Sequence, residues 1–104
     1  MKPTGPIPPD FAGEVRLTLG GRDFAGLVEQ VGTPLFVYDF AVVADRVARL
    51  RAAFPGIALH YAIKANPFAT LLAAIGPLVD GLDVASAGEL ERALAVKPAA
   101  AISF

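Results

Sequence analysis

The chain from residue 57 to its end alternates between strand-like and helix-like hydrophobic patterns. Short, nearly continuous apolar runs are typical of strands covered on both faces, and apolar residues three or four apart indicate helices. This alternation with short connections predicts a parallel sheet with right-handed crossovers. An open doubly wound sheet and a closed (β/α)8 barrel both fit the order. The predicted elements are a strand at 57–65, a helix at 67–75, a strand at 81–85, a helix at 87–97 and a strand at 99–104.

Both predicted helices in this part of the chain begin at residues that favour helix starts. Asn66 precedes Pro67, and proline suits the first helical position because its missing N–H is not needed there. Ser86 and Glu89 have the spacing of a capping box, in which each side chain accepts a hydrogen bond from the other residue's backbone N–H. Glu89 therefore has a sufficient structural role without any part in chemistry.

The N-terminal half of the chain predicts a tail, short strands and two helices. Residues 1–10 are rich in proline and glycine, which predicts a flexible tail. The other predicted elements are a strand at 11–19 followed by a glycine turn, a helix at 24–31 with Asp23 as candidate N-cap, a strand at 35–38, and a helix at 40–54 with Asp39 as N-cap. The last helix has one apolar stripe, formed by Phe40, Val43, Val47, Leu50 and Phe54.

The composition restricts the classes of protein. Hydrophobic residues make up 55% of the 104 residues and the formal net charge is −1, which argues against disorder and against nucleic-acid binding. The chain has no cysteine, so disulfides, thiolate nucleophiles and cysteine zinc sites are excluded, and no metal site is predicted. No apolar stretch reaches the roughly 18 residues of a membrane span. We expect a cytoplasmic protein without a membrane partner.

Lys64 is the strongest candidate for chemistry. Side chains two apart share a face of a strand, so His60, Ala62 and Lys64 are predicted to point the same way. Asp83 follows on the next strand, and parallel α/β folds place their sites at such strand ends. A lysine becomes a nucleophile toward an aldehyde when its surroundings leave the amine partly neutral. The end of an apolar strand provides such surroundings.

The spacing of these residues also fits ordinary structural roles. Lys64 can be a solvated strand end, and Asp83 can be a strand-end or turn acid. His60 fits a hydrogen-bonded core or barrel-floor histidine better than a catalytic one. From the residues alone, both interpretations of Lys64 stay open.

Four blocks of sequence, in a fixed order, resemble one enzyme family over about two-thirds of the chain, from residue 33 to residue 104. The blocks are TPLFVYD at 33–39, YAIKANP at 61–67, GLDVASAGEL at 81–90 and ISF at 102–104. They resemble the pyridoxal-phosphate-dependent decarboxylases of the diaminopimelate, ornithine and arginine group. The opening MKPTGPIP, at 1–8, also resembles the subgroup of these decarboxylases associated with exosortase systems.

The resemblance implies a fold and a division of the chain. The family fold is an alanine-racemase-like (β/α)8 TIM barrel accompanied by a β-domain. On this basis the chain would consist of a flexible tail at 1–10, β-domain edge strands and a short helix at 11–38, and the first βαβαβ part of the cofactor-binding barrel at 39–104. The family's glycine-rich phosphate loop and later site residues have no match here. We therefore expect an incomplete barrel, a fragment that is inactive alone.

The resemblance also implies the cofactor pyridoxal 5′-phosphate and the residues around it. Lys64 would hold the cofactor as an internal aldimine, Asp83 and Ala62 would lie beside it, and Ser86 and Glu89 would lie near the site. The implied activity is that of a carboxy-lyase acting on a small amino acid, in a full-length form that is a homodimer. Two alternatives remain: a barrel-type pyridoxal-phosphate amino-acid racemase, and a non-catalytic α/β module. The Asn-Pro-Phe continuation at 66–68 favours the decarboxylase.

Overall fold

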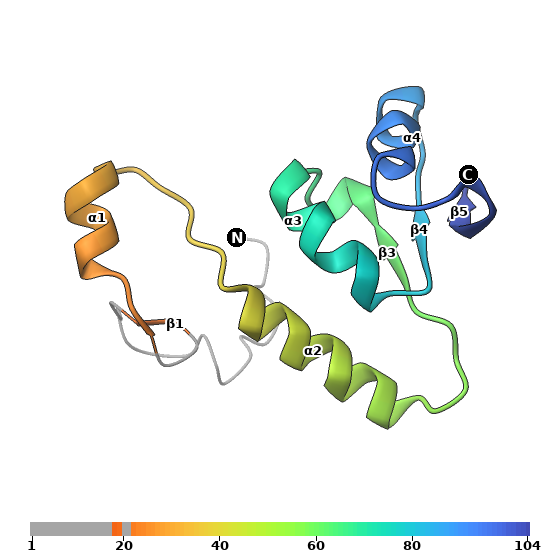
Figure 1. Cartoon of the computed structure of the whole chain (residues 1–104), viewed down its shortest axis with the longest axis horizontal. Coiled ribbons are helices and arrows are strands. Elements are labelled where there is room, and N and C mark those ends of the chain that lie inside the picture. The colour runs from red at the N-terminus through yellow and green to blue at the C-terminus, as the bar shows by residue number, and fades with distance from the viewer. Residues whose placement is uncertain (1–17, 20–21) are drawn as a thin grey trace, which may run out of the picture. The chain divides into compact units, whose positions relative to one another are not determined.

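The structure, a computed structural model, describes residues 18–19 and 22–104 (Figure 1). The predicted tail at 1–10, most of the predicted strand at 11–19 and the glycine turn after it lie outside the described residues. So do residues 1–8, which carry the resemblance to the exosortase-associated subgroup. Within the described ranges, no helix is long and apolar enough to span a membrane.

The chain divides into two compact units, residues 1–36 and 37–104. In the first unit, strand β1 (Thr18–Leu19) pairs antiparallel with strand β2 (Arg22–Asp23), and helix α1 (Ala25–Val31) follows. The helix confirms the prediction for this segment to within one residue. The assignment of residues 11–38 to a β-domain of the family stays a prediction.

Helix α1 ends at the predicted residue and begins one residue later than predicted. The Oδ1 atom of Asp23 accepts a hydrogen bond from Ala25 N–H at 2.8 Å, although Phe24 is the residue at the helix boundary. Gly32 ends the helix with a φ of 84°, a left-handed conformation that favours glycine.

The strand predicted at 35–38 is wrong, because these residues form no strand in the structure. A strand needs a neighbour to take up its backbone N–H and C=O groups. Neither of the two sheets found among the described residues includes this segment. The apolar residues at 35–38 have a local preference for strand, but this preference does not provide a neighbouring strand to pair with.

Helix α2 (Phe40–Ala53) opens the second unit and confirms the longest predicted helix. Asp39 is its N-cap, and the Asp39 Oδ1 atom accepts a hydrogen bond from Ala41 N–H at 2.9 Å. The predicted apolar stripe contacts the core only in its middle, where the partly buried Val43 and Val47 pack against it. The other stripe residues are 40–54% exposed, namely Phe40, Leu50 and Phe54.

The second unit contains the predicted parallel sheet (Figure 1). Its strand order is β3-β4-β5, and helices α3 and α4 lie between successive strands in the chain. The β-α-β-α-β order predicted from the hydrophobic pattern is therefore confirmed. The elements are β3 (His60–Ala62), α3 (Ala69–Ile75), β4 (Gly81–Asp83), α4 (Ala87–Leu94) and β5 (Ile102–Ser103).

The hydrophobic core lies on one face of this sheet. Ile63, Leu72 and Leu82 are its largest fully buried side chains. Leu82 and Val84 both point into this core, whereas Asp83 between them is exposed. Since alternate residues of a strand point to opposite faces, Asp83 lies on the face away from the core. The other core residues are Leu71, Ile75, Val79 and Ala93.

The first parallel strand is shorter than predicted. Only His60–Ala62 pairs with β4, and residues Ile63–Ala65 turn into a single 3-10 turn, η2. Ile63 in this turn is completely buried. The apolar run at 57–65 therefore signals burial, which a strand and a tight turn can both provide. Lys64 lies on the turn and not on the strand.

The residues before α3 differ from the predicted helix start. Asn66 Oδ1 accepts a hydrogen bond from Phe68 N–H at 3.0 Å and closes a turn that holds Pro67 outside the helix. The helix therefore begins at Ala69 and not at Pro67. A proline after an asparagine fits a turn as well as it fits a first helical position.

Helix α4 is also shorter than predicted and ends at Leu94. Lys97, the predicted last residue, precedes a proline, and that position disfavours helical backbone. Its Nζ atom instead donates a hydrogen bond to Val79 O at 2.7 Å. A 3-10 turn (Ala99–Ala101) then shortens the strand predicted at 99–104 to the two residues of β5.

Candidate active site

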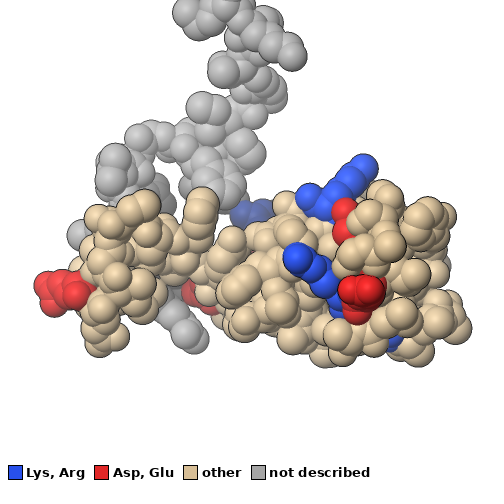
Figure 2. Space-filling view, turned by 90° about the horizontal axis from the view of Figure 1, so that it is seen from above, with Lys and Arg blue, Asp and Glu red and all other residues tan. Residues whose placement is uncertain are grey.

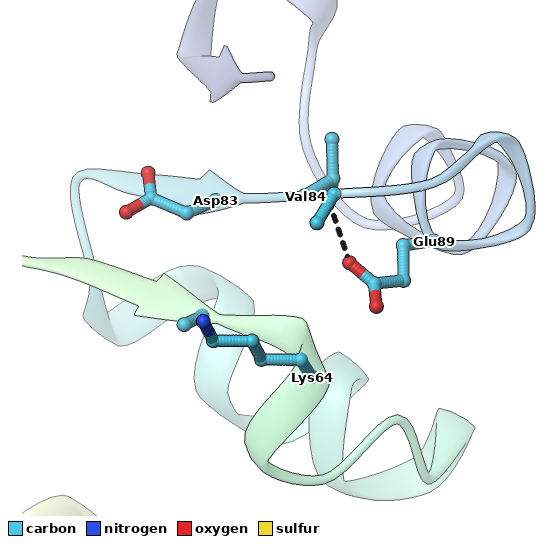
Figure 3. Close-up of a pocket in the computed structure, with 6 residues that line it drawn as sticks. Lys64, Asp83, Val84 and Glu89 are labelled. Carbon is cyan, nitrogen blue, oxygen red and sulfur yellow. Dashed lines mark hydrogen bonds between the residues drawn. The ribbon is translucent and has the colours of Figure 1, made fainter.

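An open pocket of about 140 Å³ lies where β3 and β4 end (Figure 3). Four of the five predicted site residues line it, and Ser86 does not. The strands end on the same side of the sheet because they are parallel, with Ala62 opposite Asp83 in register. The lining residues are Ala62, Lys64, Asp83, Val84, Ala85 and Glu89.

The Lys64 side chain runs along the pocket from the 3-10 turn that follows β3 (Figure 3). It was predicted to share a strand face with Ala62, and the two residues do line the same pocket although Lys64 has left the strand. Among the residues that the structure describes, Lys64 Nζ has no hydrogen-bond or ion-pair partner. Lys64 is also exposed, so its amine is open to a ligand.

Asn66 fixes the turn that carries Lys64. Its Nδ2 atom donates a hydrogen bond to the Tyr38 hydroxyl at 3.0 Å, and its backbone O accepts one from the Tyr61 hydroxyl at 3.1 Å. With the Phe68 N–H bond to Oδ1, the residue two positions after the lysine is tied to three separate parts of the chain. The turn is therefore held by side-chain contacts and not by the sheet.

Two aromatic contacts complete this support. The rings of Tyr38 and Phe68 stack with centroids 5.4 Å apart and an interplanar angle of 28°. Tyr61 packs against the core, and this burial raises the pKa of its hydroxyl above the ordinary value. Tyr61 therefore stays a neutral donor toward Asn66 at physiological pH. Periodicity did not indicate the role of Tyr38, which requires knowledge of the tertiary contact.

Asp83 is held by His60. The His60 Nδ1 and Asp83 Oδ1 atoms lie 2.9 Å apart, and the two side chains are 35% and 52% exposed. The expectation of a hydrogen-bonded histidine is right, but His60 does not lie in the core. The hydrophobic pattern predicted His60 and Asp83 on successive strands and did not predict their contact.

The backbone of β4 is shaped for this contact. His60 lies opposite Gly81 in the parallel register. A Cβ atom on Gly81 would lie 2.5 Å from His60 Cε1 and 2.7 Å from Ala101 O, both of which are shorter than real Cβ contacts. Glycine thus leaves the space through which the imidazole reaches Asp83.

Ser86 and Glu89 form only half of the predicted capping box. The Ser86 Oγ atom accepts a hydrogen bond from Glu89 N–H at 3.2 Å, as predicted. The Glu89 Oε2 atom accepts one from Ala85 N–H at 2.7 Å and not from Ser86 N–H (Figure 3). The glutamate reaches one residue further back along the chain. This contact turns its carboxylate toward the pocket that it lines.

The pocket therefore combines one unengaged primary amine with two carboxylates and two alanines. Primary amines add to aldehydes, and neighbouring carboxylates can hold or move protons during such steps. The small Ala62 and Ala85 side chains leave room for a flat ligand beside the amine. Lys64 is the one lining residue with a basic side chain, so the pocket lining offers no second cation for a phosphate group.

Residues 40–104 match the family "Pyridoxal-dependent decarboxylase, pyridoxal binding domain". The match covers more than half of the chain, so the chain belongs to the pyridoxal-dependent decarboxylase family. The resemblance stated from the four sequence blocks is confirmed. The matched domain is the pyridoxal-binding one, which supports pyridoxal 5′-phosphate as the cofactor.

Several individual relatives that the chain resembles are diaminopimelate decarboxylases. The chain is 38% identical to the diaminopimelate decarboxylase of Aquifex aeolicus over 71% of this chain and 18% of that protein. It is 38% identical to that of Bacillus subtilis over 85% of this chain and 21% of that protein. For that of Campylobacter jejuni the identity is 35%, over 69% of this chain and 18% of that protein. The chain thus spans about a fifth of the length of these relatives.

Proposed function

We propose that this chain carries the lysine-bearing part of a pyridoxal-phosphate-dependent decarboxylase site, in which Lys64 Nζ binds the cofactor covalently. The observation that carries the proposal is the pocket of about 140 Å³ at the strand ends, into which Lys64 places an amine without a partner among the described residues. The family match supports the cofactor, and the diaminopimelate decarboxylase relatives support a small amino acid with a second charged end as the substrate class.

The residues that line the pocket fit the aldehyde end of this cofactor. Lys64 supplies the primary amine that an aldehyde requires, and Ala62 and Ala85 leave space for a planar ring. Asp83 and Glu89 supply carboxylates on the neighbouring strand and helix. When bound, pyridoxal phosphate supplies an electron sink, which allows a carboxylate to leave an amino acid as carbon dioxide.

The protein side chains have separate tasks in this proposal. Lys64 anchors the cofactor and exchanges a proton at Nζ when the substrate amine takes its place. Asp83 orients groups at the end of β4 and receives or returns that proton. Glu89 lines the same pocket, and Ser86 holds the start of α4, the helix from which Glu89 extends.

We also propose which parts of the family's barrel and β-domain this chain contains. We place residues 39–104 at the start of an alanine-racemase-like (β/α)8 barrel, for which the parallel β3-β4-β5 sheet provides support. Residues 11–38 are proposed to belong to the β-domain. The homodimer is likewise a proposal, drawn from the family.

Peptide mapping after reduction tests the role of Lys64. The chain has three lysines, Lys2, Lys64 and Lys97, so each modified peptide is easily identified. The chain is mixed with pyridoxal phosphate near equal concentration, reduced with borohydride and digested. We expect most of the added pyridoxyl mass on the Lys64 peptide.

Two variants make this experiment decisive. Lys64→Ala should abolish the dominant labelling, and Lys97→Ala should leave it on Lys64. Equal labelling of all three lysines in the parent chain, or undiminished total labelling in Lys64→Ala, would contradict the proposed role.

A further inference from the structure

Both carboxylates that line the pocket are already bound by donors other than Lys64. Asp83 Oδ1 is bound by His60 Nδ1 at 2.9 Å, and Glu89 Oε2 is bound by Ala85 N–H at 2.7 Å. Lys64 Nζ forms no ion pair with either acid, although all three side chains line one pocket (Figure 3). An amine beside two carboxylates would ordinarily pair with one of them.

This arrangement bears directly on how the amine reacts. A carboxylate within about 4–6 Å of a lysine stabilises the ammonium form, which cannot attack an aldehyde. A carboxylate that accepts a hydrogen bond from another donor attracts the ammonium less. The donor fixes the position of the carboxylate and partly offsets its negative charge. A lysine that must capture an aldehyde therefore benefits when neighbouring acids are held by other donors.

The contact between His60 and Asp83 depends on several features of the sheet. The parallel register places His60 opposite Gly81, two residues before Asp83 on β4. Gly81 has no side chain to obstruct the imidazole, which passes close to its backbone. The donor to Glu89, in contrast, is the backbone N–H of Ala85. No side-chain substitution removes this donor, so the experiment addresses Asp83.

We propose that His60 is a positioning residue that binds the Asp83 carboxylate, so that Asp83 does not form an ion pair with the free Lys64 amine and the amine stays reactive toward aldehydes. The inference rests on the proposed role of Lys64 as the aldehyde-binding residue. It assigns a task to His60, which lies outside the pocket lining and acts only through Asp83. Removal of the imidazole frees Asp83 to pair with Lys64.

Reductive methylation by formaldehyde measures this reactivity without pyridoxal phosphate. The neutral lysine amine adds to the aldehyde carbon, water leaves, and cyanoborohydride delivers hydride to the resulting C=N bond. The rate at Lys64 is divided by the rate at Lys97 in the same molecule, measured on their separate peptides. Lys97 Nζ is bound to Val79 O and serves as an internal reference.

The expected result is a fall in the Lys64 rate, relative to Lys97, of about three- to tenfold at pH 8 in His60→Ala, because an Asp83 carboxylate that pairs with Lys64 stabilises the unreactive ammonium form. His60→Asn restores most of the rate, because its amide can donate from nearly the same position as Nδ1. An unchanged or faster Lys64 rate in His60→Ala overturns the inference. Failure of His60→Asn to exceed His60→Ala overturns it as well.

A double-mutant comparison separates positioning from a general structural effect. In an Asp83→Ala background no Asp83 carboxylate remains to pair with Lys64, so adding His60→Ala should change the rate by less than about twofold. An equal fall in both backgrounds shows that His60 acts by another route and contradicts the inference.

A spectroscopic measurement checks the contact itself. His60 is the chain's single histidine, so its imidazole ¹⁵N signals are assigned without ambiguity. Asp83→Asn should move the Nδ1 signal and leave Nε2 less affected. If neither nitrogen responds, the His60–Asp83 bond is not formed in solution. Because formaldehyde replaces the cofactor throughout, a chain that fails to bind pyridoxal phosphate can still pass or fail these tests.

Discussion

Arg51, near the end of α2, is joined to Asp80 just before β4 by an ion pair with an Nη1–Oδ2 distance of 3.1 Å. The same guanidinium donates through Nη2 to Leu78 O at 2.9 Å. Asp80 Oδ2 also accepts a hydrogen bond from Leu59 N–H at 2.7 Å, just before β3. The Asp80 carboxylate thus connects helix α2 to the segments that precede strands β3 and β4. Acidic and basic side chains lie next to one another on the face shown in Figure 2.

The first prediction concerns the acid stability of this junction. The hydrogen bond from Leu59 N–H, followed in importance by that from the Arg51 guanidinium, holds the pKa of Asp80 below its ordinary value. A carboxyl whose pKa is lower in the folded state stabilises the fold above its unfolded pKa, and this contribution disappears as the pH falls through the folded value. Asp80→Asn should therefore lower the melting temperature at pH 7 and pH 5, with the difference narrowing below about pH 4.

A matched substitution controls for the loss of one charge. Glu91 is an exposed acid on α4, and Glu91→Gln should leave the melting temperature nearly unchanged across the same pH range. A difference between Asp80→Asn and the parent chain that stays constant down to pH 2 would show that the carboxylate is not the source of the effect.

The second prediction concerns the core beneath the sheet. Leu82 on β4 is completely buried, so Leu82→Ala should lower the free energy of unfolding by about 2–4 kcal/mol, from lost burial and the remaining cavity. Leu94→Ala makes the same chemical change at a side chain that is 50% exposed, and should cost less than about 1 kcal/mol. Urea unfolding followed by circular dichroism measures both, and equal losses would place the core elsewhere.

The third prediction concerns the space under His60. Gly81→Ala introduces a Cβ that must displace the imidazole or the Ala101 carbonyl, so it should destabilise the fold by about 1–3 kcal/mol and perturb the His60 imidazole signals. Gly88→Ala on α4 is the control, because a Cβ there meets nothing within 4 Å and alanine favours helix. A Gly81→Ala chain with unchanged stability and unchanged imidazole signals would refute the close approach.

The fourth prediction concerns the hydrogen bonds of Asn66, which hold the 3-10 turn that carries Lys64. Asn66→Ala removes the side-chain bonds to the Tyr38 hydroxyl and to Phe68 N–H, and should cost about 1–3 kcal/mol in unfolding free energy. Asn66→Asp keeps the acceptor for Phe68 and loses the donor toward Tyr38, so it should cost less. Chemical denaturation of the parent chain and the two variants gives the three free energies of unfolding. If Asn66→Asp lowers this free energy as much as Asn66→Ala does, the hydrogen bond to Phe68 N–H does not contribute to stability.

The hydrophobic pattern predicted the second unit better than the first. Strand-helix alternation from residue 57 indicated the parallel order because buried strands and short connections leave few other arrangements. It overestimated the strand at 57–65, since the same apolar run serves a strand and a buried turn. It also predicted a strand at 35–38, where the side chains favour strand but the described chain offers no pairing neighbour.

The candidate site shows a similar limit. Spacing placed Lys64, Ala62 and Asp83 near one another, and they line one pocket. Spacing did not predict the bond from His60 to Asp83 or the contact of Asn66 with Tyr38, 28 residues earlier. Both contacts depend on strand register and on the packing of distant segments. Their geometry becomes visible only when the sheet is assembled.

The placement of Lys64 on a 3-10 turn has a consequence for motion. No ladder hydrogen bond of β3 belongs to the turn, so Lys64 and the residues that follow it can move locally while Ile63 stays in the core and the three-stranded sheet stays paired. The free energy of such an opening is set by a few side-chain bonds around Asn66 and not by the global stability of the unit. A lysine that must attach to a ligand and later release it can then change position through local motion of this short segment, while the strands and helices of the unit keep their places.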